Sequence, residues 1–179
     1  MLKIVLTGPR YCVIDFETTG LSPHQCEVIE FAAVRVENGE LGLNLASLCN
    51  PHGHISAKIT QITGITPYMT AGYPPFEELL PLLLDFIGND ILVAHNLPFD
   101  WGFLSQYCAR AEREFRPQTL CTLQLARRKI KGLKSYKLSS VSDFLQIPNP
   151  AAHRALGDAT TTAQILIKLL KMKTMFAYG

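Results

Sequence analysis

Five residues of this chain have the side chains and the surroundings of a hydrolytic metal site. Asp15 and Glu17 lie in one short stretch, Asp100 in a second, and His153 and Asp158 in a third. Each carboxylate lies in or beside apolar sequence, where a charge costs several kcal/mol unless it is paired or binds a metal. Carboxylates without a cysteine partner favour a hard cation such as magnesium or manganese. An acidic site with one histidine indicates hydrolysis by metal-assisted attack of water.

Asp15 and Glu17 are two positions apart, so on a β-strand both side chains project from one face, while Ile14 and Phe16 occupy the other. The Cα atoms of two residues so spaced lie roughly 7 Å apart. The two carboxylates can then converge on cations, which two-metal sites hold about 3.5–4 Å apart. The alternative is a strand end whose acids merely face water.

Asp100 is predicted near the start of a helix. Pro98 suits the first helical position, which would make Asp100 the third residue, close to the positive end of the helix dipole. His95 and Asn96 lie just before it, at the carboxyl end of a strand, where open α/β sheets bind ligands. The alternative for Asp100 is ordinary helix-start chemistry.

Asp158 is predicted near the start of the last helix, and His153 precedes it by five residues. On one continuous helix the two side chains would diverge by roughly 140°. We therefore expect His153 on the preceding loop, where a histidine can act as a general base at neutral pH. The alternative is an ordinary loop histidine. Glu30, inside an apolar run, is either a further ligand or a buried structural acid, and the structural role is favoured.

The elements that position these residues can be read from hydrophobic spacing and turn signals. Short β-prone runs and an Asn38-Gly39 hairpin signal predict three strands in succession, followed by alternating helices and strands. The predicted fold class is α/β, a mixed sheet flanked by helices. The expected strands are residues 11–16, 28–36, 41–49 and 91–94; the expected helices are residues 55–62, 76–86 (with Pro81 as a kink or break), one from Pro98, 119–129, 138–145 and one along 155–170.

Composition fits a single domain over residues 1–179. Hydrophobic residues make up 47% of the chain and charged residues 18%, enough for a substantial core. The five cysteines are scattered without a Cys-x-x-Cys pair, which argues against a disulfide framework or a zinc knuckle. No apolar run of about 20 residues and no convincing signal peptide are present, so a cytoplasmic protein without membrane contact is expected. Residues 1–10 are expected to form either an edge strand or a disordered leader.

The net charge of +2 is too small to indicate a polyanionic partner, but its distribution is uneven. Six cations fall within the eleven residues from 127 to 137. Such a cluster can attract a phosphate backbone, and equally it can be a solvated helix end and loop.

In the order of its motifs the chain resembles the DEDDh family of 3′–5′ exonucleases, the DnaQ-like group. The resemblance spans about residues 10–172. The three motifs are DFETTGL (residues 15–21), HNLPFD (95–100) and HRALGDA (153–159).

The resemblance implies a ribonuclease H-like fold with a five-stranded mixed sheet whose first three strands are antiparallel. It implies that Asp15, Glu17 and Asp158 bind two divalent cations, Mg²⁺ or Mn²⁺, with Asp15 bridging them. Asp100 would complete the site, partly through water, and His153 would take a proton from the attacking water.

The resemblance also implies residues that hold the 3′-terminal nucleotide. Phe99 would pack against it, and the ITGIT segment (residues 62–66) resembles the family's Gly-Ile-Thr loop near it. Thr63 stands where proofreading members commonly have a histidine; it can donate a hydrogen bond but cannot be charged. The full set of expected substrate-binding residues is Phe16, Thr18, Thr19, Leu21, Thr63, Asn96 and Phe99.

Within the family the chain is most similar to the DNA polymerase III epsilon-subunit and PolC proofreading type. The implied function is release of 5′-mononucleotides from the 3′ end of single-stranded or frayed DNA, in proofreading or repair. A DNA polymerase catalytic subunit is an implied partner. Two alternatives stay open: an exoribonuclease with the same mechanism, and a weakly catalytic nucleic-acid-binding module associated with a polymerase.

Overall fold

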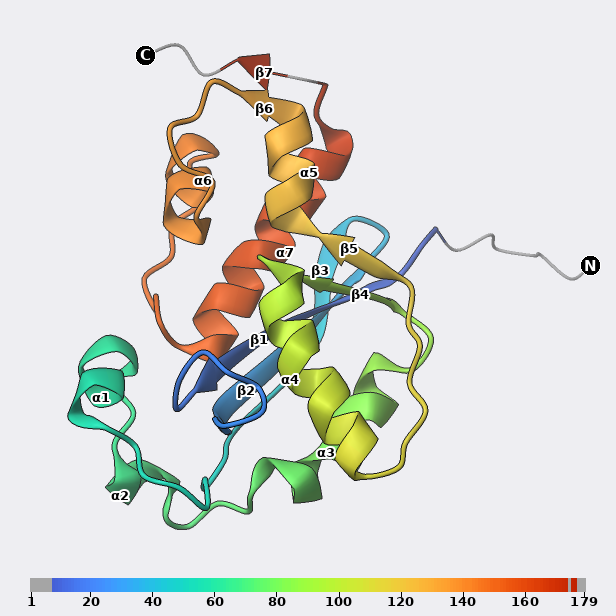
Figure 1. Cartoon of the computed structure of the whole chain (residues 1–179). Helices are drawn as coiled ribbons and strands as arrows, with labels where there is room; N and C mark the ends of the chain where they lie inside the picture. The colour runs from blue at the N-terminus through green and yellow to red at the C-terminus, as the bar shows by residue number, and fades with distance from the viewer. Residues whose placement is uncertain (1–7, 174, 177–179) are drawn as a thin grey trace, which may run out of the picture.

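The computed structural model describes residues 8–173 and 175–176 and has a five-stranded mixed sheet at its centre (Figure 1). The strand order is β3-β2-β1-β4-β5. β1 is antiparallel to β2, and β2 to β3, whereas β4 runs parallel to β1 and to β5. The bounds are β1 Tyr11–Thr18, β2 Val28–Glu37, β3 Glu40–Leu48, β4 Ile91–Ala94 and β5 Thr119–Cys121. The predicted five-stranded mixed sheet, with its first three strands antiparallel, is confirmed.

The first three strands form because the sequence specifies both their burial and their turn. Asn38 and Gly39 have φ angles of 54° and 77°, the left-handed conformation that tight hairpin turns require. β2 is buried along most of its length, and β3, at the edge of the sheet, is largely exposed. The predicted hairpin is thus present.

Helices cover both faces of the sheet (Figure 1). α3 (Phe76–Ile87) and α4 (Leu97–Arg110) pack on one face, against Ile14 and Phe16 of β1. α7 (Ala155–Lys171) packs on the other face, against Tyr11 and Val13. The odd-numbered residues of β1 therefore face α7, and the even-numbered residues face α3 and α4.

Three details differ from the sequence-based expectations. Residues 119–121, expected as helix, form β5, and α5 (Thr122–Lys129) begins after them. α4 begins at Leu97, so Pro98 is its second residue and Asp100 its fourth. Pro81 does not divide α3, because a helix can lose one hydrogen bond when its apolar face is buried.

The remaining elements are short. α1 falls close to the expected short helix, whereas α2 and the small β6–β7 pair were not expected. They are α1 Ala57–Thr63, α2 Pro67–Thr70, β6 Ile130–Lys131, α6 Leu138–Phe144 and β7 Met175–Phe176. Of the described residues, none belongs to a helix long and apolar enough to cross a membrane. Residues 1–7, most of the segment expected as edge strand or leader, lie outside the described part of the chain.

Candidate active site

Three carboxylates converge where β1 meets the start of α7. Asp15 and Glu17 project from the α7-facing side of β1, and Asp158 lies in the first turn of α7. One carboxylate oxygen from each of the three lies within 4.8 Å of the others. The spacing of two along β1 and the packing of α7 on that face bring together acids that are far apart in sequence, as predicted.

Asp158 is oriented by two donors from the loop before α7. Its Oδ1 accepts a hydrogen bond from Asn149 Nδ2 at 2.6 Å, and its Oδ2 accepts one from the backbone N–H of His153 at 3.1 Å. Asn149 was not predicted from the sequence. Its only local signal is the Pro148-Asn149-Pro150 turn, which gives no reason to place its amide beside Asp158.

Asp100 reaches the site from α4, on the opposite face of the sheet. Its Oδ1 accepts a hydrogen bond from the backbone N–H of Phe16 at 3.1 Å, between the two acids of β1. The side chain is almost fully buried, with 3% of its surface exposed. Asp100 thus lies next to the cluster of Asp15, Glu17 and Asp158, outside the set whose oxygens converge.

The carboxyl groups are held where ionisation is costly. Burial raises the pKa of Asp15 well above its ordinary value, and the nearby charges of Asp100, Asp158 and Glu17 raise it further. Burial, followed by the charges of Asp158 and Glu30, raises the pKa of Glu17 to about 7. Burial also raises the pKa of Asp100 to about 8, although the Phe16 N–H opposes the shift.

This donor set fits a divalent cation. Crowded, buried carboxylates oppose one another unless a cation lies among them, and oxygen ligands are those that magnesium and manganese prefer. Asp15, Glu17 and Asp158 could therefore hold a metal directly, with Asp100 beside them. Metal binding would displace protons from these groups.

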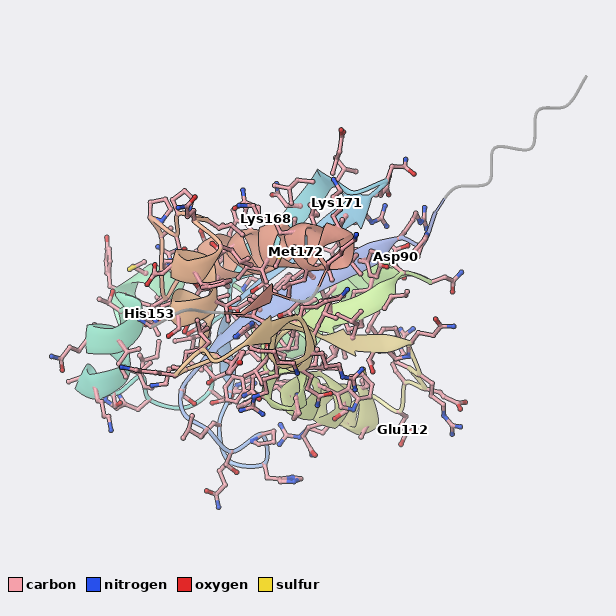
Figure 2. All side chains as sticks on the ribbon, turned by 90° about the horizontal axis from the view of Figure 1, so that it is seen from above. Asp90, Glu112, His153, Lys168, Lys171 and Met172 are labelled. Carbon is pink, nitrogen blue, oxygen red and sulfur yellow. The ribbon has the colours of Figure 1, made fainter. Side chains whose placement is uncertain are left out.

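His153 lies on the loop before α7, as predicted. Its side chain is exposed, and its φ of 61° is unusual for a residue other than glycine. Its backbone N–H contacts Asp158, so the left-handed turn fixes the histidine at the edge of the acidic cluster. Figure 2 shows His153 at the end of the molecule opposite Asp90, which precedes β4. Such backbone outliers are found preferentially at functional sites.

Glu30 has a structural partner in Arg154, which agrees with the favoured interpretation of Glu30. Arg154 Nε lies 3.1 and 3.0 Å from the two carboxylate oxygens, and the backbone N–H of Ala155 donates to Oε2 at 2.9 Å. Glu30 lies directly across from Glu17 in the β1–β2 register. The pair therefore ties the start of α7 to the strand beside the acidic cluster. Sequence reasoning did not find Arg154, because 124 positions separate it from Glu30.

A cavity of about 470 Å³ lies beside the acidic cluster, between the end of β1 and α1. Glu17 is part of its wall. Six of the seven expected substrate-binding residues line it: Phe16, Thr18, Thr19, Leu21, Thr63 and Phe99. Asn96 does not; it is an exposed residue before α4, with a φ of 66°.

Two further features of the cavity concern α1. The Thr63 hydroxyl donates to Ile59 O and accepts from the Ile65 N–H, both at 3.0 Å, so it is already engaged by backbone. Lys58 also lines the cavity and was not predicted, since a lone lysine on a short helix carries no distinguishing signal.

Two solved exonuclease structures share this architecture. Exonuclease X in complex with 5′ overhanging duplex DNA matches with a TM-score of 0.75 and 30% identity, covering 89% of this chain and 90% of that one. Exonuclease I matches with a TM-score of 0.80 at 21% identity, covering 92% of this chain and 41% of that one, a likeness of fold. The fold and the acidic cluster thus define a nuclease of the ribonuclease H-like class.

The sequence comparisons then give the family. A profile of the exonuclease family matches residues 12–166. The DNA polymerase III subunit epsilon of Aquifex aeolicus (strain VF5) is 41% identical over 175 residues, 97% of this chain and 86% of that protein. The PolC-type DNA polymerase III of Clostridium perfringens (strain 13 / Type A) is 38% identical over 92% of this chain, which spans only 11% of that protein. The chain belongs to the exonuclease family, and its predicted place among the DnaQ-like 3′–5′ exonucleases is confirmed.

Proposed function

We propose that the chain is a divalent-metal-dependent enzyme that releases 5′-mononucleotides from the 3′ end of single-stranded or frayed DNA. One observation carries the proposal: a cavity of about 470 Å³ at the end of β1 has Glu17, one of the three convergent carboxylates, in its wall. A cavity of this size suits one terminal nucleotide, with the scissile phosphate at the acids. This arrangement favours cleavage at a strand end over cleavage within a strand.

The proposed roles follow from the positions of the side chains. Asp15, Glu17 and Asp158 hold two cations, Mg²⁺ or Mn²⁺, and Asp100 completes the site. When bound, the cations supply electrostatic stabilisation of the attacking and leaving oxygens. The carboxylates must be ionised to bind them, so the raised pKa values of Glu17 and Asp100 weaken metal binding as the pH falls.

His153 is the proposed general base. A water oxygen attacks the phosphorus, and His153 takes the proton that the water loses. The bond from phosphorus to the 3′ oxygen breaks, and that oxygen takes a proton from solvent. The products are a 5′-mononucleotide and a strand shortened by one residue with a free 3′ hydroxyl.

The remaining assignments concern the nucleotide. Leu21, exposed over 84% of its surface, and Phe99 offer apolar surface to a base at the mouth of the cavity. Thr18, Thr19 and Thr63 line the same cavity, and Asn96 precedes α4, four residues before Asp100.

DNA is the favoured substrate because similar proteins include a DNA polymerase III subunit epsilon and a PolC-type DNA polymerase III. A DNA polymerase catalytic subunit is the corresponding proposed partner. Co-elution of the purified chain with such a subunit in gel filtration would test the partnership, and independent elution at micromolar concentrations would count against it.

The decisive experiment is digestion of matched DNA and RNA oligomers carrying the label at the 3′ or the 5′ end. We expect mononucleotides from the 3′ end of DNA in Mg²⁺ or Mn²⁺, and none in EDTA. Asp15→Asn is the matched inactive control. Faster digestion of RNA would instead assign an exoribonuclease, and strand binding without any product in Mn²⁺ would assign a binding module.

A further inference from the structure

A run of positive charge follows β5 and contains no acid. Between residues 115 and 142 there are seven lysines and arginines and no aspartate or glutamate. Five of them form what we call the basic segment, and all five are exposed: Arg127, Arg128, Lys131, Lys134 and Lys137. Within the described part of the chain, none of the five makes a salt bridge with a carboxylate. Their charge is available to an external anion.

The basic segment is fastened to the sheet at the acidic site. Tyr136 O pairs with His95 Nε2 at 2.9 Å, and the other ring nitrogen of His95 contacts the Thr122 hydroxyl at 3.0 Å. The Tyr136 hydroxyl donates to Ile130 O at 2.7 Å, and the Arg127 guanidinium lies over the Tyr136 ring. The connection between α5 and α6 is therefore held in place across the end of β4.

His95 itself lies next to the carboxylates. β4 runs parallel to β1 with Val93 opposite Val13, so two residues further along, His95 is level with Asp15 on the neighbouring strand. Burial lowers the pKa of His95, while the Tyr136 carbonyl and the charge of Asp158 oppose that shift. The basic segment therefore lies next to the acidic cluster, with His95 between them.

The cavity for the terminal nucleotide lies on another side of the same cluster. It is bounded by α1 and the end of β1, and no residue of the basic segment lines it. In Figure 1, α1 lies below the start of α7 and α6 lies above it. A strand whose last nucleotide occupies the cavity and whose scissile phosphate meets the carboxylates continues away from α1, and the side toward α5 and α6 is positively charged.

We propose that the basic segment binds the phosphodiester backbone of the nucleic-acid strand upstream of its 3′-terminal nucleotide. This inference rests on the proposed function, since it takes the terminal nucleotide to lie in the cavity. Backbone contacts of this kind carry no sequence preference and set the affinity for long substrates. The segment therefore contributes binding affinity for the strand, and it is separate from the groups that cleave the strand.

An anionic lipid surface is the competing occupant for exposed cations. Membrane-binding segments combine their cations with exposed apolar side chains that enter the lipid. Among the described residues, the large exposed hydrophobic side chains all lie outside residues 115–142. The charge pattern without apolar partners favours a nucleic acid.

The test uses a triple variant, Lys131→Gln/Lys134→Gln/Lys137→Gln, and a control of equal charge change, Arg110→Gln/Arg113→Gln/Arg116→Gln. The control arginines are also exposed and lie at and beyond the far end of α4. Figure 2 shows Glu112, between two of them in sequence, far from His153. Binding of a 20-residue single strand is measured in EDTA by fluorescence anisotropy, and hydrolysis of the same strand and of a dinucleotide is measured in Mg²⁺.

We expect the lysine variant to bind the long strand roughly 10- to 100-fold more weakly, since each neutralised phosphate contributes about 0.7 to the slope of log affinity against log salt. The slope itself should fall by about 2 if all three contacts are lost. KM for the long strand should rise while KM and kcat for the dinucleotide stay near those of the wild type. The arginine control should leave strand binding within about 2-fold.

Equal binding by the lysine variant and the wild type, with unchanged salt slopes, would overturn the proposal. So would an equal loss in the arginine control, because net charge alone would then explain it. Retention of anionic vesicles by the wild type in place of the strand would assign the segment to lipid. If the wild type binds the strand but cleaves neither substrate, the proposed function fails, and the binding measurement in EDTA still decides on the segment.

Discussion

The pair of Glu30 and Arg154 offers the sharpest test of how the site is held together. Arg154→Met removes the guanidinium and leaves Glu30, 6% exposed, with one hydrogen bond, from the Ala155 N–H. Removing one partner of a buried ion pair costs about 3–5 kcal/mol. Because the Arg154 side chain is 43% exposed, water screens part of this loss, and we expect about 2–3 kcal/mol.

The variant should also affect function through the residues it orients. Arg154 lies at the start of α7, four residues before Asp158, and its charge lowers the pKa of Glu17. Its loss should raise that pKa further and loosen Asp158. Groups that orient metal ligands typically account for 10- to 100-fold in metal affinity or activity, so we expect about a 10-fold loss of kcat, with the pH profile moved upward.

Urea unfolding in EDTA gives the free energy, and a double-mutant cycle with Glu30→Gln isolates the pair. The double variant should be less destabilised than Arg154→Met alone, with a coupling energy of at least about 1 kcal/mol, because no unpaired buried charge remains. Arg154→Lys is the conservative control and should recover part of both stability and turnover. A single variant within about 0.5 kcal/mol of the wild type, or strictly additive effects, would refute the reasoning.

Three further predictions concern the acids and the histidine. Asp15→Asn should lower turnover by at least about 10²-fold and raise the melting temperature of the metal-free protein, since it relieves the crowding of the carboxyl groups that raises the pKa of Asp15; wild-type rates in a folded variant would contradict this. The pKa values of Glu17 and Asp100 are raised on folding to about 7 and about 8, so the folded state binds more protons than the unfolded state between pH ~4 and ~8. The stability of the metal-free protein should therefore fall as pH rises through this window, and Mg²⁺ should restore it. Unfolding curves at pH 5 and pH 8, with and without Mg²⁺, measure this. An equal free energy of unfolding at the two pH values without Mg²⁺ would show that the shifts are absent. His153→Asn, which tolerates the left-handed backbone, should keep thermal stability and Mg²⁺ affinity but lose about 10²–10⁴-fold in turnover; wild-type turnover in this variant would exclude His153 as the base.

Much of the fold could be predicted from the sequence because its signals are local. The alternation around Asp15 and Glu17 fixed the face of β1, and Asn38-Gly39 fixed the hairpin. β5 could not be separated from α5, because three residues cannot show a strand period and the adjoining residues have helical spacing. The Thr66-Pro67 pair, a capping residue followed by proline, is a local signal that would have located α2.

The site residues likewise fall into those that the sequence predicts and those that only the folded structure shows. Its carboxylates and histidine could be predicted as a set, because residue type and order together are specific to a family. Their supports could not, since Arg154 and Asn149 find their partners only through the packed fold. The environment of Asp100 was also out of reach, because its raised pKa depends on burial by elements that join it only after folding.

The packing of α7 against β1 has a consequence for synthesis of the chain on a ribosome. Asp15 is made early, whereas Asp158 comes 143 residues later (158 minus 15). At about 5–20 residues per second, translation leaves the first strand without Asp158 for several seconds or more. A nascent chain that has formed its first hairpin thus holds only two of the three carboxylates of the acidic cluster. The three carboxylates can therefore converge only after Asp158 has been synthesised and α7 has packed on β1.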